Sequence, residues 1–250
     1  MDAATSPFKV GAQTEVKIGP GARNRRSALS SPRAEGESNS LVVELLDTWR
    51  SFDSLTQLTS FEDNIFGPDF AIAPERMRTW ADSGSWVCAA VTGQAVVGRQ
   101  QVFSLLSILV TTAESRDLLL SGKITECDLQ PWTHNPLDEK PALYLSSVVS
   151  MASEHLAMMY HSVATDLAHF RSTWETDFSS GFCIASGPAG FSHMSRNGFR
   201  CVEANKYRGH YPMMVIDATS AATRFWQELF LAHHNDELAA PSFPSVHLAP

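Results

Sequence analysis

The sequence lacks several features that would place the protein among membrane or secreted proteins. It contains no run of about 18 apolar residues, so a membrane span is not expected. Its first residues lack the apolar core of a secretory signal. Cysteine is scarce, and none of Cys88, Cys127, Cys183 and Cys201 stands in a Cys-x-x-Cys or other metal-ligand spacing. We therefore expect small, buried, reduced thiols and a cytoplasmic location.

Motifs of several enzyme and binding classes are also missing. No Ser-His-Asp order with a Gly-x-Ser-x-Gly elbow is present, which argues against a hydrolase. The segment Gly187–Gly190 lacks the spacing of a P-loop or a dinucleotide fingerprint. His161 and His169 lie about two helical turns apart without a third ligand, so no metal site is expected. The formal charge of −8 argues against a nucleic-acid binder, which is usually basic.

The sequence does contain enough apolar material for one sizeable folded domain. Of its 250 residues, 44% are hydrophobic, which is ordinary for a globular protein. Residues 1–38 are rich in Ser, Ala, Gly and Arg, which predicts a disordered tail. We expect a single domain over residues 39–235 and a loose tail over residues 236–250, where prolines recur without periodicity.

Strand and helix signals alternate in the C-terminal half. Short apolar runs rich in β-formers predict strands at Ala142–Val149 and Gly181–Ser186, with further strand signal over Arg200–Asp217. Helical spacing predicts a long helix over Glu154–Trp174 and a short one over Pro188–Asn197. A strand–helix–strand crossover implies neighbouring parallel strands, where α/β proteins tend to place ligands.

The N-terminal half begins with two predicted helices. The first is expected over about Ser40–Leu58, because Leu41, Leu45, Trp49 and Phe52 fall on one face. The second begins at Pro74-Glu75, since proline in the first turn followed by an acid suits a helix start, and it ends at about Asp82.

Predicted strands and one helix follow. Trp86–Val91 and Ala95–Arg99 read as a hairpin, because a Thr-Gly-Gln connection joins two apolar runs. Val102–Val110 continues as an apolar strand. A short helix is expected over Ala113–Leu120, and a further strand over Ile124–Leu129.

In this order the chain resembles the GNAT superfamily of acyltransferases over roughly residues 40–218. The hairpin Trp86–Gly98, which ends in Val-Gly, is similar to the family's second and third strands. The segment Ala189–Phe199 is similar to the late helix that ends in Gly-Phe before the sixth strand. The resemblance implies an α/β fold: a mixed, mostly antiparallel twisted sheet flanked by helices, with splayed parallel central strands. It also implies an acyltransferase that uses acyl-CoA.

Two departures from the family pattern bear on the donor and on the chemistry. The family's acyl-CoA loop reads Gln/Arg-x-x-Gly-x-Gly/Ala, whose glycines let backbone amides approach a diphosphate. Here Glu154 takes the Gln/Arg place, Ala157 the first glycine and Met159 the second. A carboxylate would repel a diphosphate and Met159 would crowd it. Met194 stands where the family often has a tyrosine that protonates the thiolate, and methionine cannot donate a proton.

Two hypotheses accommodate these departures. In the first, the chain is an N-acyltransferase that takes its acyl group from an acyl carrier protein, as the similar acyl-homoserine-lactone synthases and N-acyl amino acid synthases do. The expected co-substrate is acyl-CoA or, with a carrier-protein donor, acyl-phosphopantetheine, and the acceptor is a small-molecule amine or amino acid. No metal, nucleic acid or membrane span is expected. In the second, the fold has lost catalysis and serves as a ligand- or protein-binding module.

Amine acylation needs a base for the amine, donors for the thioester carbonyl and an acid for the thiolate. Glu126 and Asp128 flank Cys127 on a predicted strand, where alternation would place both carboxylates on one face as base or ammonium ligand; the alternative is a solvated strand face. His193 lies beside the expected acid position and titrates near neutrality, although a surface histidine is the alternative. Direct attack by the amine is expected, because Cys183 lies in an apolar run that keeps its thiol neutral.

The remaining candidates would hold the two substrates. Residues assigned to the acyl donor are Ser147, Val148, Val149, Ser153, His155 and Ala157. Amides of Val148 and Val149 would polarise the carbonyl, Ser153 would cap the long helix, and His155 would contact phosphate. Tyr207 and Tyr211, on the predicted late hairpin, are assigned to the acceptor pocket; the alternative is ordinary strand aromatics.

Overall fold

A computed structural model describes a central part of the chain. The described residues are 42–45, 52–67, 70, 72–94, 100–134 and 140–230. The expected tails over residues 1–38 and 236–250 lie outside them, as does the predicted strand segment 95–99. The domain boundaries therefore stay predictions.

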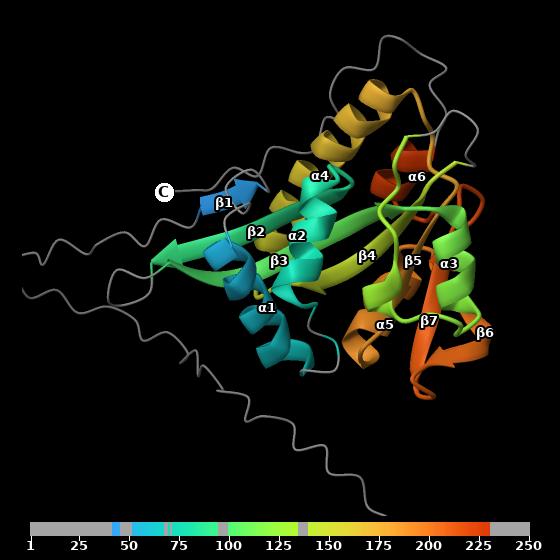
Figure 1. Cartoon of the computed structure of the whole chain (residues 1–250), viewed down its shortest axis with the longest axis horizontal. Coiled ribbons are helices and arrows are strands. Elements are labelled where there is room, and N and C mark those ends of the chain that lie inside the picture. The colour runs from blue at the N-terminus through green and yellow to red at the C-terminus, as the bar shows by residue number, and fades with distance from the viewer. Residues whose placement is uncertain are drawn as a thin grey trace, which may run out of the picture. The chain divides into compact units, whose positions relative to one another are not determined.

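The described residues form a seven-stranded mixed sheet in the order β1-β2-β3-β4-β5-β7-β6 (Figure 1). The strands are β1 (Val42–Leu45), β2 (Trp86–Gln94), β3 (Gln100–Thr111), β4 (Ala142–Val149), β5 (Ser180–Ile184), β6 (Arg200–Tyr207) and β7 (Tyr211–Ile216). Neighbouring strands run antiparallel except β4 and β5, which are parallel and central. The α/β fold class with a mostly antiparallel sheet is confirmed.

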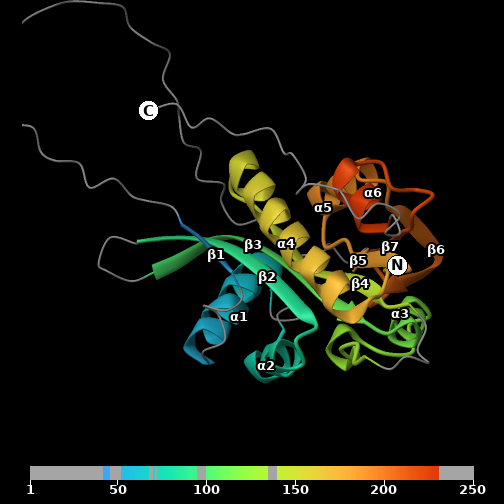
Figure 2. The same ribbon diagram turned by 90° about the horizontal axis from the view of Figure 1, so that it is seen from above.

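Helices cover both faces of this sheet. They are α1 (Phe52–Phe66), α2 (Pro74–Asp82), α3 (Ala113–Leu120), α4 (Ser153–Trp174), α5 (Pro188–Arg196) and α6 (Arg224–Phe230), with a short 3-10 helix η2 (Glu126–Asp128). Figure 2 shows α4 lying along one face and α1 and α2 on the other. Helices α2 to α5 agree closely with the sequence prediction, whereas α6 was not predicted.

Two hydrophobic cores result, one on each face, and alternate residues of β4 enter them. Leu143 and Leu145 pack with α4, α5 and α6, while Ala142 and Tyr144 pack with α1, α2 and α3. Because β4 is buried on both faces here, its sequence reads as an almost continuous apolar run. This is why the strand could be recognised from sequence.

The expected helix over Ser40–Leu58 is wrong in its first half. Val42–Leu45 forms strand β1, whose residues pair with β2, and helix α1 begins only at Phe52. Spacing alone cannot separate a short strand from a helix, and here the distant partner strand decides. In the predicted hairpin, Trp86–Val91 falls within β2, whereas Ala95–Arg99 lies outside the described residues. The predicted connection is wrong, because Thr92 and Gly93 lie inside β2, beside a register shift, opposite β3.

The expected strand over Ile124–Leu129 is also wrong, because Glu126–Asp128 forms the 3-10 turn η2. The Asp128 carboxylate accepts hydrogen bonds from the backbone N–H and the hydroxyl of Thr125, at 2.8 and 2.7 Å. A short polar side chain that bonds to the backbone three residues earlier favours a turn over a strand. The alternation that placed Glu126 and Asp128 on one strand face therefore does not apply.

Candidate functional site

The two parallel strands separate near the middle of the sheet. Strands β4 and β5 pair from Ala142 opposite Ser180 to Leu145 opposite Cys183. Beyond that point β4 continues to Val149, paired with β3. Peptide groups of a strand point alternately to its two sides, so some groups of this last segment face the space left by β5.

A β-bulge bends β4 where the separation begins. Ser107 of β3 lies opposite Ser147 and Ile108 lies opposite Leu145, which leaves Ser146 as an extra residue. The Ser146 and Ser107 hydroxyl oxygens are 2.6 Å apart, and the Ser146 hydroxyl also lies 3.2 Å from the Ser107 carbonyl oxygen. Bulges bend and twist the strand that carries them, which accounts for the divergence from β5.

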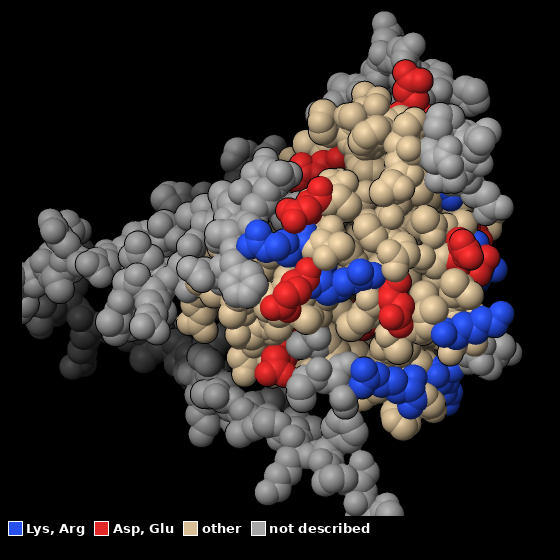
Figure 3. Space-filling view, viewed as in Figure 1, with Lys and Arg blue, Asp and Glu red and all other residues tan. Residues whose placement is uncertain are grey.

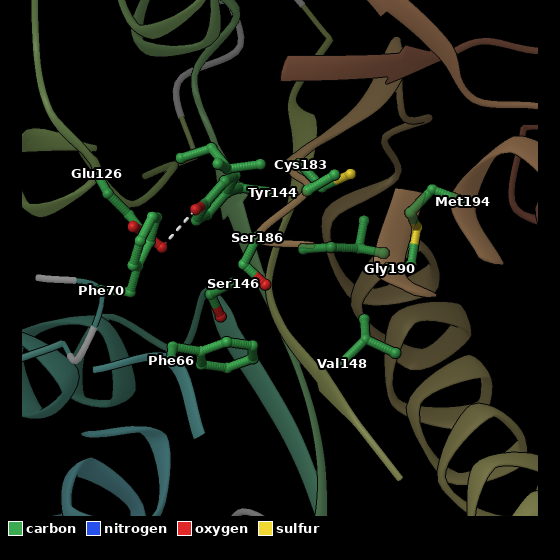
Figure 4. Close-up of a pocket in the computed structure, with 13 residues that line it drawn as sticks. Phe66, Phe70, Glu126, Tyr144, Ser146, Val148, Cys183, Ser186, Gly190 and Met194 are labelled. Carbon is green, nitrogen blue, oxygen red and sulfur yellow. Dashed lines mark hydrogen bonds between the residues drawn. The ribbon is translucent and has the colours of Figure 1, made fainter. Parts of the chain in front are cut away.

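A pocket opens where the strands diverge, and it reaches both faces of the sheet (Figure 4). Its walls are Phe66, Phe70, Glu126 and Tyr144 on the face of α1 and α2, and Val148, Cys183, Gly190 and Met194 on the face of α4 and α5. We call this pocket the slot. Ser146 lines it between the two sets of residues. The slot is therefore lined by residues from both faces of the sheet.

Glu126 supplies the acidic group of the slot. Its side chain is 5% exposed and accepts a hydrogen bond from the Tyr144 hydroxyl. Burial raises the pKa of Glu126 to about 8; the bond from Tyr144 and the charge of Arg208 oppose this rise, and the nearby Glu62 adds to it. A carboxyl group that titrates near neutrality can take or return a proton under ordinary conditions.

A second buried acid, Glu62 of α1, was not found from the sequence. It is 1% exposed, it accepts a hydrogen bond from the Ser147 hydroxyl, and it accepts one from the N–H of Ile72 at 3.4 Å. Burial raises its pKa to about 7, against these two bonds. The sequence carried a signal: Leu55, Leu58 and Glu62 share one face of α1, so an acid interrupts an apolar stripe.

The structure separates the two predicted catalytic carboxylates. Asp128 is exposed, and the hydrogen bonds from Thr125 hold its pKa below the usual value. It does not line the slot; Glu126 does. The turn, rather than a strand, is the reason for their different positions.

His193 lies on α5, next to the slot residue Met194 but outside the lining. Its Nε2 is 3.1 Å from the Tyr160 hydroxyl on α4. Partial burial, followed by the charge of Arg196, lowers the pKa of His193, so the imidazole is mostly neutral at neutral pH. Burial raises the pKa of Tyr160, and the Cys183 thiol adds to this effect. The pair therefore lies near the Cys183 wall of the slot.

The three donor candidates on β4 take different positions. Val148 lines the slot, whereas Ser147 is buried toward Glu62 and Val149 lies opposite Leu105 of β3. Of these three residues, Val148 is therefore the one that lines the slot.

The assignment of residues at the start of α4 to the acyl donor stays a prediction. The N-cap is Ala152, without a side-chain cap, and Ser153 donates instead to the Glu154 carboxylate at 3.2 Å. The exposed Glu154 has a lowered pKa, first through its own backbone N–H and then through Ser153. A negative charge thus occupies the positive end of the helix. The expected cap by Ser153 is wrong.

The other helix candidates differ in exposure. His155 is half-buried, with Nδ1 2.9 Å from the Ser104 hydroxyl of β3, and Ala157 is exposed. Met159 is fully buried in the core beneath α4. The expectation that Met159 crowds the helix start is therefore wrong, because its side chain faces the sheet.

Tyr207 and Tyr211 stand behind one wall of the slot. Their rings lie 6.0 and 4.6 Å from the ring of Phe70, centroid to centroid, the second edge-on. Tyr207 is buried and Tyr211 half-buried, and neither lines the slot itself. They hold the position of Phe70 rather than touching the space beside Glu126.

Charges of both signs are spread over the described surface that Figure 3 shows, with several basic side chains gathered toward its lower right. No described helix has the length and apolar character needed to cross a bilayer. Across the described ranges, no group of three or more His, Cys, Asp or Glu side chains is placed to hold a metal ion.

No family model matches the sequence, and no curated protein matches it. One similar solved structure is Arabidopsis thaliana NAA60 in complex with acetyl-CoA, at 11% identity over 71% of this chain and 97% of that chain, with a TM-score of 0.44. Another is an uncharacterized protein from Bacillus halodurans, at 10% identity over 76% of this chain and 89% of that one, with a TM-score of 0.41. Identities this low carry no activity over to the present chain.

Proposed function

We propose that this chain is an acyltransferase of the GNAT type, which moves an acyl group from a thioester to the amine of a small molecule or amino acid. The observation that carries the proposal is the slot: parallel strands part at a bulge, and a buried acid stands on one side of the opening. A thioester entering from the α4 and α5 face meets an amine from the α1 and α2 face.

In this proposal Glu126 is the base. The neutral amine attacks the thioester carbonyl carbon, the carbon–sulfur bond breaks, and the amine proton passes to the Glu126 carboxylate. A pKa of about 8 makes this group basic enough to accept the proton while a useful fraction is ionised. The backbone amide of Val148 would hold the oxyanion of the tetrahedral intermediate.

The leaving thiolate needs a proton on the opposite face of the slot. Met194 lines that face and cannot supply one. His193, bonded to the Tyr160 hydroxyl beside the Cys183 wall, remains the proposed acid. It would give the proton from its imidazolium form, which its lowered pKa makes the minor form near pH 7. Cys183 is not proposed as a nucleophile, because burial raises the pKa of its thiol and keeps it protonated.

The donor is proposed to be acyl-phosphopantetheine or acyl-CoA, with the first favoured. Glu154 at the start of α4 places a carboxylate where a nucleotide diphosphate would need free amides. A donor without the nucleotide avoids this repulsion, so an acyl carrier protein is a candidate partner.

A second function, a non-catalytic binding module, is favoured by the same two residues. Met194 in the slot and Glu154 on α4 both remove groups that thioester chemistry would use. A module of this kind would bind a ligand in the slot and release no thiol.

Measurement of thiol release tests the proposal. The protein is mixed with acetyl-CoA, a long-chain acyl-CoA or the matching acyl-pantetheine, each with a panel of primary amines and amino acids. We expect amine-dependent thiol release from at least one donor. Thermal unfolding with each donor runs in parallel, since a ligand at about 100 times its Kd adds roughly 2.7 kcal/mol of stability. Stabilisation without thiol release would favour the binding module.

A further inference from the structure

Glu62 is a buried acid that the acyl-transfer step described above does not use. Only 1% of its surface is exposed. Within the described part of the chain, no salt bridge joins it to lysine or arginine. Burying an ionisable group without a partner of opposite charge is costly, so its place in the core calls for a physical reason.

The Glu62 carboxyl joins two segments that lie next to slot residues. It accepts the hydroxyl of Ser147, the residue directly after the bulge on β4. It also accepts the N–H of Ile72 at 3.4 Å, while Thr59, one turn earlier on α1, donates to the Ile72 carbonyl oxygen at 2.8 Å. Helix α1 thus holds both backbone groups of Ile72, two residues after the slot residue Phe70.

Glu62 and Glu126 approach the same face of β4. Tyr144, which bonds to Glu126, and Ser147, which bonds to Glu62, lie three residues apart. The bulge at Ser146 brings these two side chains to one face. Charge on one acid therefore opposes charge on the other, and this repulsion contributes to the raised pKa of Glu126.

Other ionisable groups act on this pair. Arg208 lowers the pKa of Glu126, and the neutral Tyr144 hydroxyl lowers it by its hydrogen bond. Two thiols near this pair have raised pKa values, chiefly through burial, and are neutral near pH 7. They are Cys127, beside Glu126, and Cys88 of β2, whose pKa the charge of Glu62 also raises. The charge of Glu62 raises the pKa of Glu126 against the effects of Tyr144 and Arg208.

We propose that Glu62 is a positioning residue for the acid–base step, holding the bulged end of β4 against the α1–α2 connection and presenting its carboxyl group to the same face of β4 as Glu126. This inference rests on the proposed function for its catalytic meaning. The coupling of the two carboxyl groups is a property of the fold and can be measured without any substrate.

Glu62→Gln separates the two roles. Glutamine offers a carbonyl oxygen to Ser147 and Ile72 but carries no charge. We expect the titration midpoint of Glu126, followed by NMR of 13C-labelled glutamate side chains, to fall by at least about 0.5 pH unit. The rising limb of the plot of kcat/KM against pH should move by the same amount. Glu62→Leu removes the hydrogen bonds as well, and we expect kcat near pH 9.5 to fall at least about tenfold below that of Glu62→Gln.

The outcomes are distinct. An unchanged Glu126 midpoint in folded Glu62→Gln would overturn the coupling, and equal kcat in the Gln and Leu variants would overturn the positioning role. Loss of folding in Glu62→Leu alone would support the positioning role, because the Gln variant keeps the hydrogen bonds and still reports the midpoint. A midpoint that moves in a protein that releases no thiol would remove the proposed function and leave the coupled pair in place.

Discussion

The two halves of β4 share a backbone direction and differ in almost everything else. Ala142–Leu145 is paired on both sides, with β3 and β5, and its side chains enter the two cores. Ser146–Val149 follows the end of pairing with β5, begins with a bulge and carries two serines. The first half is mainly scaffold and contributes Tyr144 and Leu145 to the slot, whereas the second half contributes Ser146 and Val148 beyond the end of pairing with β5.

The difference shows how a sheet can place a site in its own interior without an exposed edge. The first half fixes the strand, so the bulge can bend the second half without unfolding it. The polar groups of the second half are then held by named partners: Ser146 by Ser107, and Ser147 by Glu62. Rigid elements hold a reactive geometry better than loops do.

The largest effect should come from removing the buried acid that lines the slot. Glu126→Gln keeps the size of the side chain and removes the proposed base, so kcat should fall by about 10²- to 10⁴-fold. Steady-state thiol release measures this loss. Glu75→Gln, at an exposed acid in the first turn of α2, is the matched control and should retain wild-type activity. Equal activity of the two variants would remove Glu126 from the mechanism.

Stability should depend on pH through the two buried acids. Their carboxyl groups titrate near 4.5 when unfolded, and at about 7 for Glu62 and about 8 for Glu126 when folded. Between these values the folded state holds more protons than the unfolded state, so the free energy of unfolding falls as pH rises. Urea unfolding at pH 5 to 8 should show a fall that is smaller in the double variant Glu62→Gln/Glu126→Gln. An identical pH dependence in both proteins would contradict the claim that burial raises the pKa values of Glu62 and Glu126.

Added side-chain volume beside the paired half of β4 should lower the stability of the protein. A Cβ at Gly181, opposite Leu143, would lie 2.8 Å from Ile216 Cγ2 and 3.3 Å from Trp226 Cζ3. Gly181→Ala should therefore destabilise the protein by about 1–3 kcal/mol through overpacking. Chemical denaturation measures this change, and an unchanged midpoint would mean that the core beside β5 adapts more easily than its close packing implies.

Added side-chain volume at Gly190, which lines the slot, should instead raise the stability of the protein. A Cβ there meets no atom within 4 Å, and the residue lies in helix α5. Gly190→Ala should raise stability by roughly 0.5–1 kcal/mol, because alanine favours the helix. The same methyl group narrows the slot, so the KM for the acyl donor should rise. A stabilised variant with an unchanged KM would show that the donor does not pass this wall.

The same comparison explains which parts could be predicted from the sequence. The strand Ala142–Val149 and the helices on either side of β5 have strong local patterns, and they were predicted closely. The bulge at Ser146, the turn at Glu126 and the bond between Ser147 and Glu62 depend on partners far along the chain. Glu126 was named for a strand geometry that does not exist, although the structure places it in the slot. Local periodicity indicates helices and strands, but it does not indicate which of them contact one another in the folded protein.

The most direct test of the account follows backbone amide signals of β4 by 15N NMR while a non-reactive acyl-thioester analogue is added. We predict large shifts for Ser146–Val149, strongest at Val148, and small shifts for Ala142 and Leu143, which do not line the slot. Binding with shifts confined to residues outside the slot, or spread equally over both halves of β4, would contradict the claim that the second half of β4 receives the thioester.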